Sequence, residues 1–263
     1  MGGPVAFAMT ASAVEQVARV LLAARRDRRA ADAAPWADVL ASPAQAYEVQ
    51  ALVAQGMAPE AGFPRYWKAG GPSRETLLTH AALPAKGVWT SPADARAWPF
   101  NLRLIEAEIA LRLGADVTAA QAARMKHEAA ASLIDAMAVS IEVVDSRWLQ
   151  GPAAPPLLKL ADLQSHGALV VGDWRPYSAL DWGRQACSVR IGAQAAAEFR
   201  GAHALGDPAW VLPAWLRHAT RAGETVPRGT VVTTGTWCGM LPASQGDLVV
   251  ARFEGVGEAA VRL

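Results

Sequence analysis

Hydrophobic positions in the first 60 residues recur at the spacing of an α-helix. Ser12 and Glu15 can each bond the other's backbone amide as a capping box, and apolar residues then recur every three or four positions to about Arg29. Ser42–Pro43 supplies the N-cap and first-turn proline of a second helix, which should end near Gly56. The pattern therefore predicts two amphipathic N-terminal helices.

Residues 61–100 have no sustained hydrophobic period. Glycine and proline are scattered among polar and aromatic residues throughout this stretch. Such a composition predicts a loop system, and long loops within a compact domain are commonly functional. We expect this segment to cover an active site.

The remainder of the chain carries short apolar runs of strand length. An Ala-rich helical stretch capped by Thr118 extends in pieces to about Met137, and another helix is expected at 208–222. Because strands and helices do not alternate strictly, the order indicates an α+β fold with a largely β core, closed as one domain over residues 12–263. The predicted strands are 105–113, 140–145, 168–172, 187–191, 230–234, 247–253 and 259–263.

Composition and charge narrow the functional classes. Lys and Arg number 25 against 24 Asp and Glu, so no net field attracts nucleic acid or an anionic membrane. Two cysteines, Cys187 and Cys238, are too few for a disulfide framework and fit a reducing compartment. The start of the chain lacks a signal peptide pattern, and residues 1–11 are expected to be a disordered extension. We expect a cytoplasmic protein.

Glu106 and Glu108 stand two positions apart within the apolar run 105–113. In a strand they project from one face, so two carboxylates are held side by side at a cost in repulsion and desolvation. A bound divalent cation would remove that cost. The alternative is a solvent-facing strand, with both glutamates hydrated or paired to Arg103 and Arg112.

A third carboxylate follows another apolar strand. Asp145 comes directly after the run 140–144, at a strand end where sites are commonly built. Three oxygen donors leave room for water and a chelating substrate around Mg²⁺ or Mn²⁺. Zinc is disfavoured because no Cys or His stands nearby at ligand spacing.

Motifs along residues 12–263 resemble those of the fumarylacetoacetate hydrolase superfamily, and in particular the 2-hydroxypentadienoate (2-keto-4-pentenoate) hydratases and the 4-oxalocrotonate decarboxylases. The combination is far more specific than any single motif. The matching segments are Ala46-Tyr47-x-Val49-Gln50, Trp67-Lys68-x-Gly70-x-x-Ser73, Ile105-Glu106-Ala107-Glu108-Ile109-Ala110, Ile141-Glu142-Val143-Val144-Asp145-Ser146-Arg147, Ala161-Asp162, Val170-Val171-Gly172, Thr234-Gly235-Thr236, Gly246-Asp247 and Phe253-Glu254-Gly255-Val256-Gly257.

The resemblance implies a mixed β-roll core with N-terminal helices and a metal-dependent site. A cation would chelate the carboxylate and 2-oxo oxygens of a small 2-oxo acid and so stabilise an enolate. Lys68 matches the family's active-site lysine, which holds the substrate carboxylate or shuttles a proton. The implied metal ligands are Glu106, Glu108 and Asp145, and the implied substrate-binding residues are Ser73, Asp162, Gly235 and Thr236.

Three departures from the family pattern concern the carboxylate-binding turn and the groups that transfer protons or place water. Pro72 reshapes the turn before Ser73, Ala85 stands where relatives commonly carry an aspartate, and Leu163 replaces an asparagine. His80, in the same glycine- and proline-rich segment, is a candidate to replace the missing acid. Chelation is therefore expected to be intact, whereas the groups that place water are altered.

The resemblance favours a hydratase that converts a 2-hydroxy-2,4-dienoate into a 4-hydroxy-2-oxo acid. The sister decarboxylase needs the same enolate with less water placement, which the Ala85 departure favours. An acylpyruvate hydrolase would need a histidine and acid to activate water, and a catalytically silent subunit is the remaining alternative. A homo-oligomer is expected, with association between hydratase and decarboxylase also implied.

Overall fold

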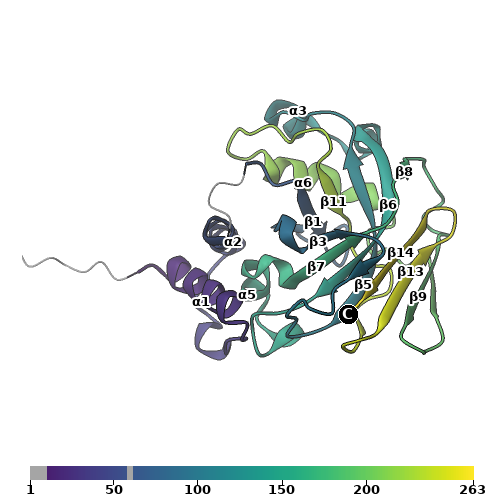
Figure 1. The fold of residues 1–263 in the computed structure, drawn as a ribbon. Coiled ribbons are helices and arrows are strands. Elements are labelled where there is room, and N and C mark those ends of the chain that lie inside the picture. The colour runs from purple at the N-terminus through teal and green to yellow at the C-terminus, as the bar shows by residue number, and fades with distance from the viewer. Residues whose placement is uncertain (1–10, 58–61) are drawn as a thin grey trace, which may run out of the picture.

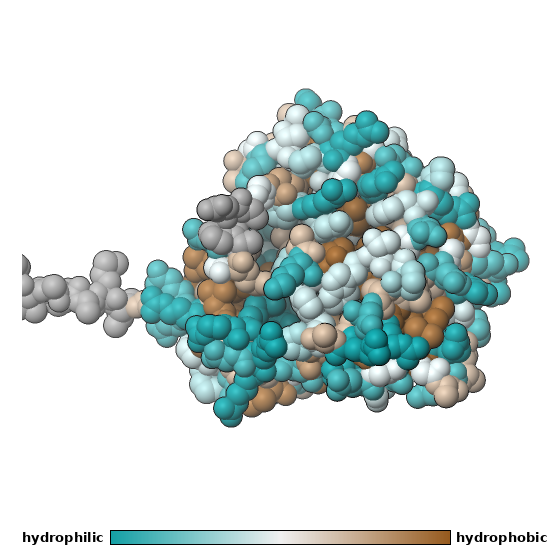
Figure 2. Space-filling view, viewed as in Figure 1, coloured by the Kyte–Doolittle hydropathy of each residue, from teal (hydrophilic) through white to brown (hydrophobic). Residues whose placement is uncertain are grey.

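The computed structural model describes residues 11–57 and 62–263, so residues 1–10 of the predicted extension lie outside the described residues. Two sheets and a group of helices make up the fold (Figure 1). None of the described helices combines the length and apolar character needed to cross a membrane. On the face in Figure 2, hydrophobic residues lie in separate groups among hydrophilic ones.

The larger sheet curls through the centre of the molecule (Figure 1). Its strands follow the order β2-β1-β11-β5-β6-β7-β3, with β12 paired to β5 and β8 paired to β6. The bounds are β1 Tyr66–Gly70, β2 Thr79–Leu83, β3 Val88–Thr90, β5 Leu104–Leu113, β6 Ile134–Val144, β7 His166–Val171, β8 Arg175–Pro176, β11 Val231–Thr233 and β12 Leu241–Pro242.

The smaller sheet packs against one face of the larger one. Its strand order is β10-β9-β13-β14-β4, and β14 and β13 contact β6. Apolar side chains of β5 such as Ile105 and Ile109 share this core with Phe253 and Val261. The bounds are β4 Ala93–Asp94, β9 Ala186–Ile191, β10 Ala197–Arg200, β13 Leu248–Phe253 and β14 Gly257–Arg262.

Three helices form a separate layer at one side of the larger sheet, near β7 in Figure 1. They are α1 (Ala13–Asp27), α2 (Pro43–Met57) and α5 (Pro156–Ala161). Buried Leu21, Val49 and Leu158 belong to one apolar cluster shared by the three. The predicted capping box is present, because Ser12 and Glu15 bond each other's backbone amides.

The fold class is as predicted, α+β with a curled mixed sheet, but several elements differ. Residues 61–100 contain short strands, because β1 finds its partner β11 more than 160 residues away, which a local pattern does not reveal. The Ala-rich stretch gives way to β6 at Ile134. The remaining helices are α3 (Ala119–Arg124), α4 (His127–Ala130) and α6 (Leu212–Ala219), with short 3-10 turns η1 (Ala34–Trp36), η2 (Ala85–Gly87), η3 (Ala131–Leu133), η4 (Gly151–Ala153), η5 (Leu163–Ser165) and η6 (Pro208–Val211).

Candidate metal and substrate site

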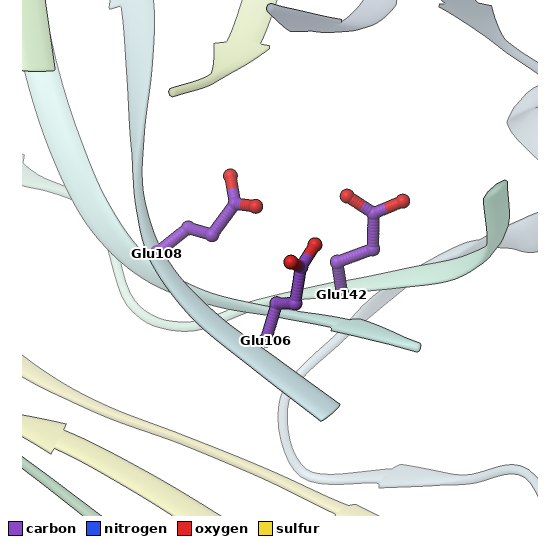
Figure 3. A group of neighbouring side chains, drawn as sticks. All are labelled: Glu106, Glu108 and Glu142. Atoms are coloured by element: carbon purple, nitrogen blue, oxygen red, sulfur yellow. The ribbon is translucent and has the colours of Figure 1, made fainter. Parts of the chain in front are cut away.

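Three glutamates converge on the concave face of the larger sheet (Figure 3). Glu106 and Glu108 project from β5, and Glu142 projects from β6, where it lies directly opposite Glu106 in the antiparallel ladder. One carboxylate oxygen from each lies within 4.8 Å of those of the other two. The alternating faces of two paired strands therefore bring three carboxylates to one point.

The pair of glutamates on β5 is not a solvent-facing pair. Glu108 is 2% exposed and Glu142 is fully buried, and only Glu106 is partly accessible. Arg112 instead pairs with Asp135, and the Arg103 guanidinium lies over the Phe100 ring. The hydrated alternative for the two glutamates is therefore wrong.

Lys68 on β1 supplies the positive charge that faces this cluster. Its Nζ donates to Glu142 Oε1 at 2.6 Å and to the carbonyl of Gln164 at 3.2 Å. Although burial acts to lower it, the neighbouring carboxylates raise the pKa of Lys68. The lysine is therefore an ammonium at neutral pH.

Burial also changes the pKa values of the glutamates. It raises the pKa of Glu106 to about 8 and that of Glu108 to about 7, against the opposing charge of Lys68. Burial also acts to raise the pKa of Glu142. The charge of Lys68 and the contact with His166 Nδ1, 3.1 Å from Glu142 Oε1, outweigh it, so the pKa of Glu142 is lowered. Three carboxylates beside one ammonium thus hold a proton readily, or would hold a cation in its place.

The donor set fits a hard divalent cation. Glu142 Oε2 is buried and has no hydrogen-bond partner among the residues that the structure describes, so it keeps lone pairs for a cation. Glu108 is oriented by its Oε2, which accepts hydrogen bonds from Thr233 Oγ1 at 2.5 Å and from the Gly235 amide at 2.8 Å. Oxygen-only ligands suit Mg²⁺ or Mn²⁺ rather than zinc. The residues that would hold the cation are Glu106, Glu108 and Glu142.

Asp145, predicted as the third ligand, lies outside the group of converging carboxylates. Its Oδ1 accepts from the backbone amides of Asn101, Leu102 and Ser146, and its Oδ2 accepts from Arg147 Nη1 at 3.3 Å. These bonds occupy the carboxylate beyond the end of β6. Asp145 therefore fixes the chain around the site, while Glu142, three residues earlier and within the strand, joins the other glutamates.

Asp162 is likewise engaged in ion pairs within the protein. It is fully buried, and its carboxylate binds Arg25 of α1 at 2.9 Å and Arg147 at 2.8 Å. Burial lowers the pKa of Arg25 to about 10, which still leaves the guanidinium charged at neutral pH. Asp162 faces Arg25 of the helical layer and is not among the residues that line the cavity described next, so its role in substrate binding stays a prediction.

A cavity of about 740 Å³ opens beside the glutamates. Lys68, Glu106 and Glu108 line it, as do Gly235 and Thr236. The Gly235 amide is already bonded to Glu108, and the Thr236 hydroxyl donates to the Gly239 carbonyl at 3.0 Å. Gly235 thus orients a glutamate, while both residues remain in the cavity wall, where the role predicted for them is still a prediction.

Two other predicted residues lie outside the cavity wall. The Ser73 hydroxyl accepts from the Glu75 amide within its own turn, and its neighbour Pro72 lines the cavity instead. His80 is buried on β2, where its ring stacks on Tyr47 and contacts His218 at a tilt, while Thr79, one position earlier, faces the cavity. The strand alternation therefore turns His80 away, so it does not replace the missing acid.

Sequence reasoning missed Glu142, Gln164, His166 and His203. Glu142 could have been found, because like Glu106 it is a charged residue within an apolar run. The other three residues lie in segments of mixed polarity, where they do not stand out. His203 lines the cavity and bonds the Thr234 carbonyl through Nε2 at 2.8 Å. Gln164 lines it too, with Nε2 donating to Thr79 Oγ1 at 2.6 Å.

The backbone around Gln164 is strained. Leu163, Gln164 and Ser165 have φ values of 51°, 53° and 58°, a left-handed conformation that costs about 1–2 kcal/mol for each non-glycine residue. This turn points the Gln164 carbonyl at Lys68 Nζ. Strain held in place by surrounding contacts commonly marks a functional position, which supports a site at Lys68.

The raised glutamate pKa values give a pH dependence without metal. Folded Glu106 and Glu108 keep their protons up to about pH 8 and 7, whereas the unfolded chain loses them near 4.5. Stability should therefore fall as pH rises from about 4.5 to 8, by about 1 kcal/mol per pH unit for each of the two groups while it is protonated only in the folded chain. Calorimetric melting in EDTA at pH 5 to 8 measures it. Addition of Mg²⁺ should restore the stability lost at high pH. The double variant Glu106→Gln, Glu108→Gln should show a weaker dependence of stability on pH. An equally steep dependence in the double variant would show that these two glutamates do not have the raised pKa values.

Replacing Asp162 by asparagine should lower the free energy of unfolding by about 3 kcal/mol, because two buried guanidiniums lose their shared carboxylate. Urea denaturation measures this. Asp27→Asn removes an exposed partner of Arg26 and should leave the free energy of unfolding unchanged. If Asp162→Asn instead kept its stability and bound substrate more weakly, the predicted substrate-binding role of Asp162 would be supported.

Comparisons with known proteins find the same fold in several solved structures. The chain is similar over 95% of its length to 4-oxalocrotonate decarboxylase from Pseudomonas putida G7 complexed with magnesium and adipate, over 96% of that chain, with 20% identity and a TM-score of 0.77. Fumarylpyruvate hydrolase from Pseudomonas aeruginosa in complex with Mn²⁺ and pyruvate matches over 77% of this chain and 91% of that one, with 16% identity and a TM-score of 0.52.

A third similar structure is 5-carboxymethyl-2-hydroxymuconate delta-isomerase from Mycobacterium smegmatis, with 17% identity over 76% of this chain and 78% of that one and a TM-score of 0.55. These likenesses establish a common fold. Residues 86–263 match the fumarylacetoacetate (FAA) hydrolase C-terminal family, and that match includes all three converging glutamates. The chain therefore belongs to the fumarylacetoacetate hydrolase family.

Proposed function

We propose that the chain is a divalent-metal-dependent lyase that adds water to a 2-hydroxy-2,4-dienoate, through its 2-oxo tautomer, to give a 4-hydroxy-2-oxo acid. The observation that carries this proposal is the convergence of Glu106, Glu108 and Glu142 beside Lys68, with Lys68, Glu106 and Glu108 in the wall of one cavity. When bound, Mg²⁺ or Mn²⁺ would supply electrophilic polarisation of the 2-oxo group. The three glutamates would hold it there.

Lys68 is suited to act as a proton donor. Its raised pKa keeps it charged, and its partners Glu142 and the Gln164 carbonyl fix the direction of the ammonium. Ketonisation of the dienol transfers a proton to C5 and removes one from the 2-hydroxyl group. Water addition then places hydroxide on C4 and a proton on C3. A fixed ammonium near the substrate can deliver such protons and can also pair with its carboxylate.

Decarboxylation of the 4-oxalocrotonate type is the second candidate. It is favoured by the TM-score of 0.77 to the Pseudomonas putida decarboxylase, and by Ala85, which stands where relatives commonly carry an aspartate. Loss of CO₂ requires the same enolate but no placed water. The two reactions therefore differ in what the cavity must position, not in the carboxylate cluster.

Proton NMR in D₂O of 2-hydroxypenta-2,4-dienoate with the protein tests the proposal. Appearance of 4-hydroxy-2-oxopentanoate with Mg²⁺, absent with EDTA and in Glu106→Gln, is the expected result. Ketonisation or C3 deuterium exchange alone would retain the enolate chemistry and reject hydration. In that case, metal-dependent CO₂ release from 2-oxohex-3-enedioate would support the decarboxylase.

A further inference from the structure

The cavity wall changes in character away from the carboxylate cluster. Lys68, Glu106, Glu108 and Gln164 lie close together in this wall, because Lys68 bonds the Gln164 carbonyl and faces the glutamates. Beyond them the lining is largely apolar, with side chains from α2, α5 and the segments that flank β5 and β12. This apolar wall includes Pro43, Leu77, Leu102, Leu157, Leu160 and Met240.

Large apolar side chains are also exposed at the mouth of this cavity. Met57, Leu77, Leu149, Trp174 and Met240 are the exposed large hydrophobic residues within 11–57 and 62–263, and two of these five line the cavity. Leu77 is 67% exposed and Met240 is 48% exposed. Apolar surface gathered around an opening is typical of a ligand groove, whereas single exposed residues need no explanation.

Positive charge is scarce along the same wall. Among the residues that the structure describes, Lys68 and Lys159 are its lysines and no arginine lines it. Lys68 already faces three carboxylates, and Lys159 Nζ donates to the Pro152 carbonyl at 2.8 Å. A second substrate carboxylate would therefore lose water in a wall whose lysines offer it Lys159 alone, an ammonium already directed at the Pro152 carbonyl, which disfavours its binding.

We propose that the substrate is a monocarboxylic acid whose end remote from the 2-oxo group is an uncharged, apolar tail that contacts Leu77, Met240 and the wall between them. This inference rests on the proposed function and selects among its substrates. A cavity of about 740 Å³ has room for such a tail beyond the reacting carbons. The same wall disfavours dicarboxylic acids, including the substrate of the decarboxylase alternative.

Calorimetric titration of the Mg²⁺-loaded protein with matched acids tests this inference. The probes are 2-oxohexanoate and 2-oxohexanedioate, which have the same carbon chain and differ in the terminal carboxylate. We expect the monocarboxylate to bind at least about tenfold more tightly. Lengthening the tail from 2-oxobutanoate through 2-oxohexanoate should tighten binding by up to about fourfold per methylene.

Two lysine variants provide a matched comparison. Leu77→Lys places a cation at the cavity mouth and should raise the affinity for 2-oxohexanedioate at least about threefold, whereas Leu149→Lys, at a residue of the same 67% exposure outside the cavity, should not. Lys159→Met should leave the affinity for both acids unchanged.

The possible outcomes separate this inference from the proposed function. Equal or tighter binding of 2-oxohexanedioate, lost in Lys159→Met, would overturn the apolar tail while leaving the metal site and 2-oxo acid chemistry intact. Failure of both acids to bind in the presence of Mg²⁺ would instead overturn the proposed function, and the inference with it.

Discussion

Glu142→Gln is expected to lower the affinity for Mn²⁺ at least about a hundredfold and to abolish metal-dependent turnover. Loss of a residue that only orients a ligand typically costs tenfold to a hundredfold, so loss of a ligand should cost at least as much. Glutamine keeps the size of the side chain but removes the charge that faces Lys68, as well as the unpartnered Oε2. Titration of Mn²⁺ followed by electron paramagnetic resonance measures the affinity directly.

Asp145→Asn is the matched control for Glu142→Gln. It removes a carboxylate three residues further along the chain, just after the end of β6. That carboxylate accepts three backbone hydrogen bonds and pairs with Arg147. We expect it to lower the free energy of unfolding by about 2 kcal/mol and to retain Mn²⁺ binding. The opposite pattern, in which Asp145→Asn loses the metal and Glu142→Gln keeps it, would reinstate Asp145 as the ligand.

Lys68→Met should reduce kcat by about 10²–10⁴-fold while the protein still binds Mn²⁺. The variant keeps the length of the side chain but removes the ammonium that contacts Glu142 and the Gln164 carbonyl, and a positioned proton donor contributes an effect of this size. Steady-state kinetics with 2-hydroxypenta-2,4-dienoate, together with the Mn²⁺ titration, separate catalysis from metal binding.

Lys159→Met is the control for Lys68→Met, because Lys159 lines the same cavity but bonds only the Pro152 carbonyl. Its kcat should remain that of the unaltered protein. Wild-type kcat in Lys68→Met, or a loss of Mn²⁺ binding that accounts for all of its lost activity, would show that the lysine has no part in proton transfer.

The sequence alone was sufficient to predict those features that depend on one strand or one helix. The alternation of side chains along β5 was enough to place Glu106 and Glu108 on one face, and Ser12 was enough to begin α1. The third glutamate depended on how β5 and β6 are aligned. That register puts Glu142 opposite Glu106, and it is set by the whole ladder rather than by residues near Glu142.

Long-range partners account for the other errors. The contacts of Asp162 come from Arg147 and from Arg25, which is 137 positions away, so the sequence around Asp162 gives no sign of its burial between two guanidiniums. The short strands β1 and β2 were hidden for the same reason. β1 is stabilised by pairing with β11, and its glycine- and proline-rich flanks resemble a loop when read alone.

The bond between Arg25 and Asp162 bears on how much chain a working catalytic unit requires. Residues 86–263 contain all three glutamates and define the family match, yet Lys68 and Arg25 precede that segment. A protein trimmed to the matched segment would keep its carboxylates but lose their ammonium counter-charge, and it would leave Asp162 and Arg147 beside a bare apolar surface at Leu158. The N-terminal third is thus an integral part of the enzyme rather than an accessory appended to it.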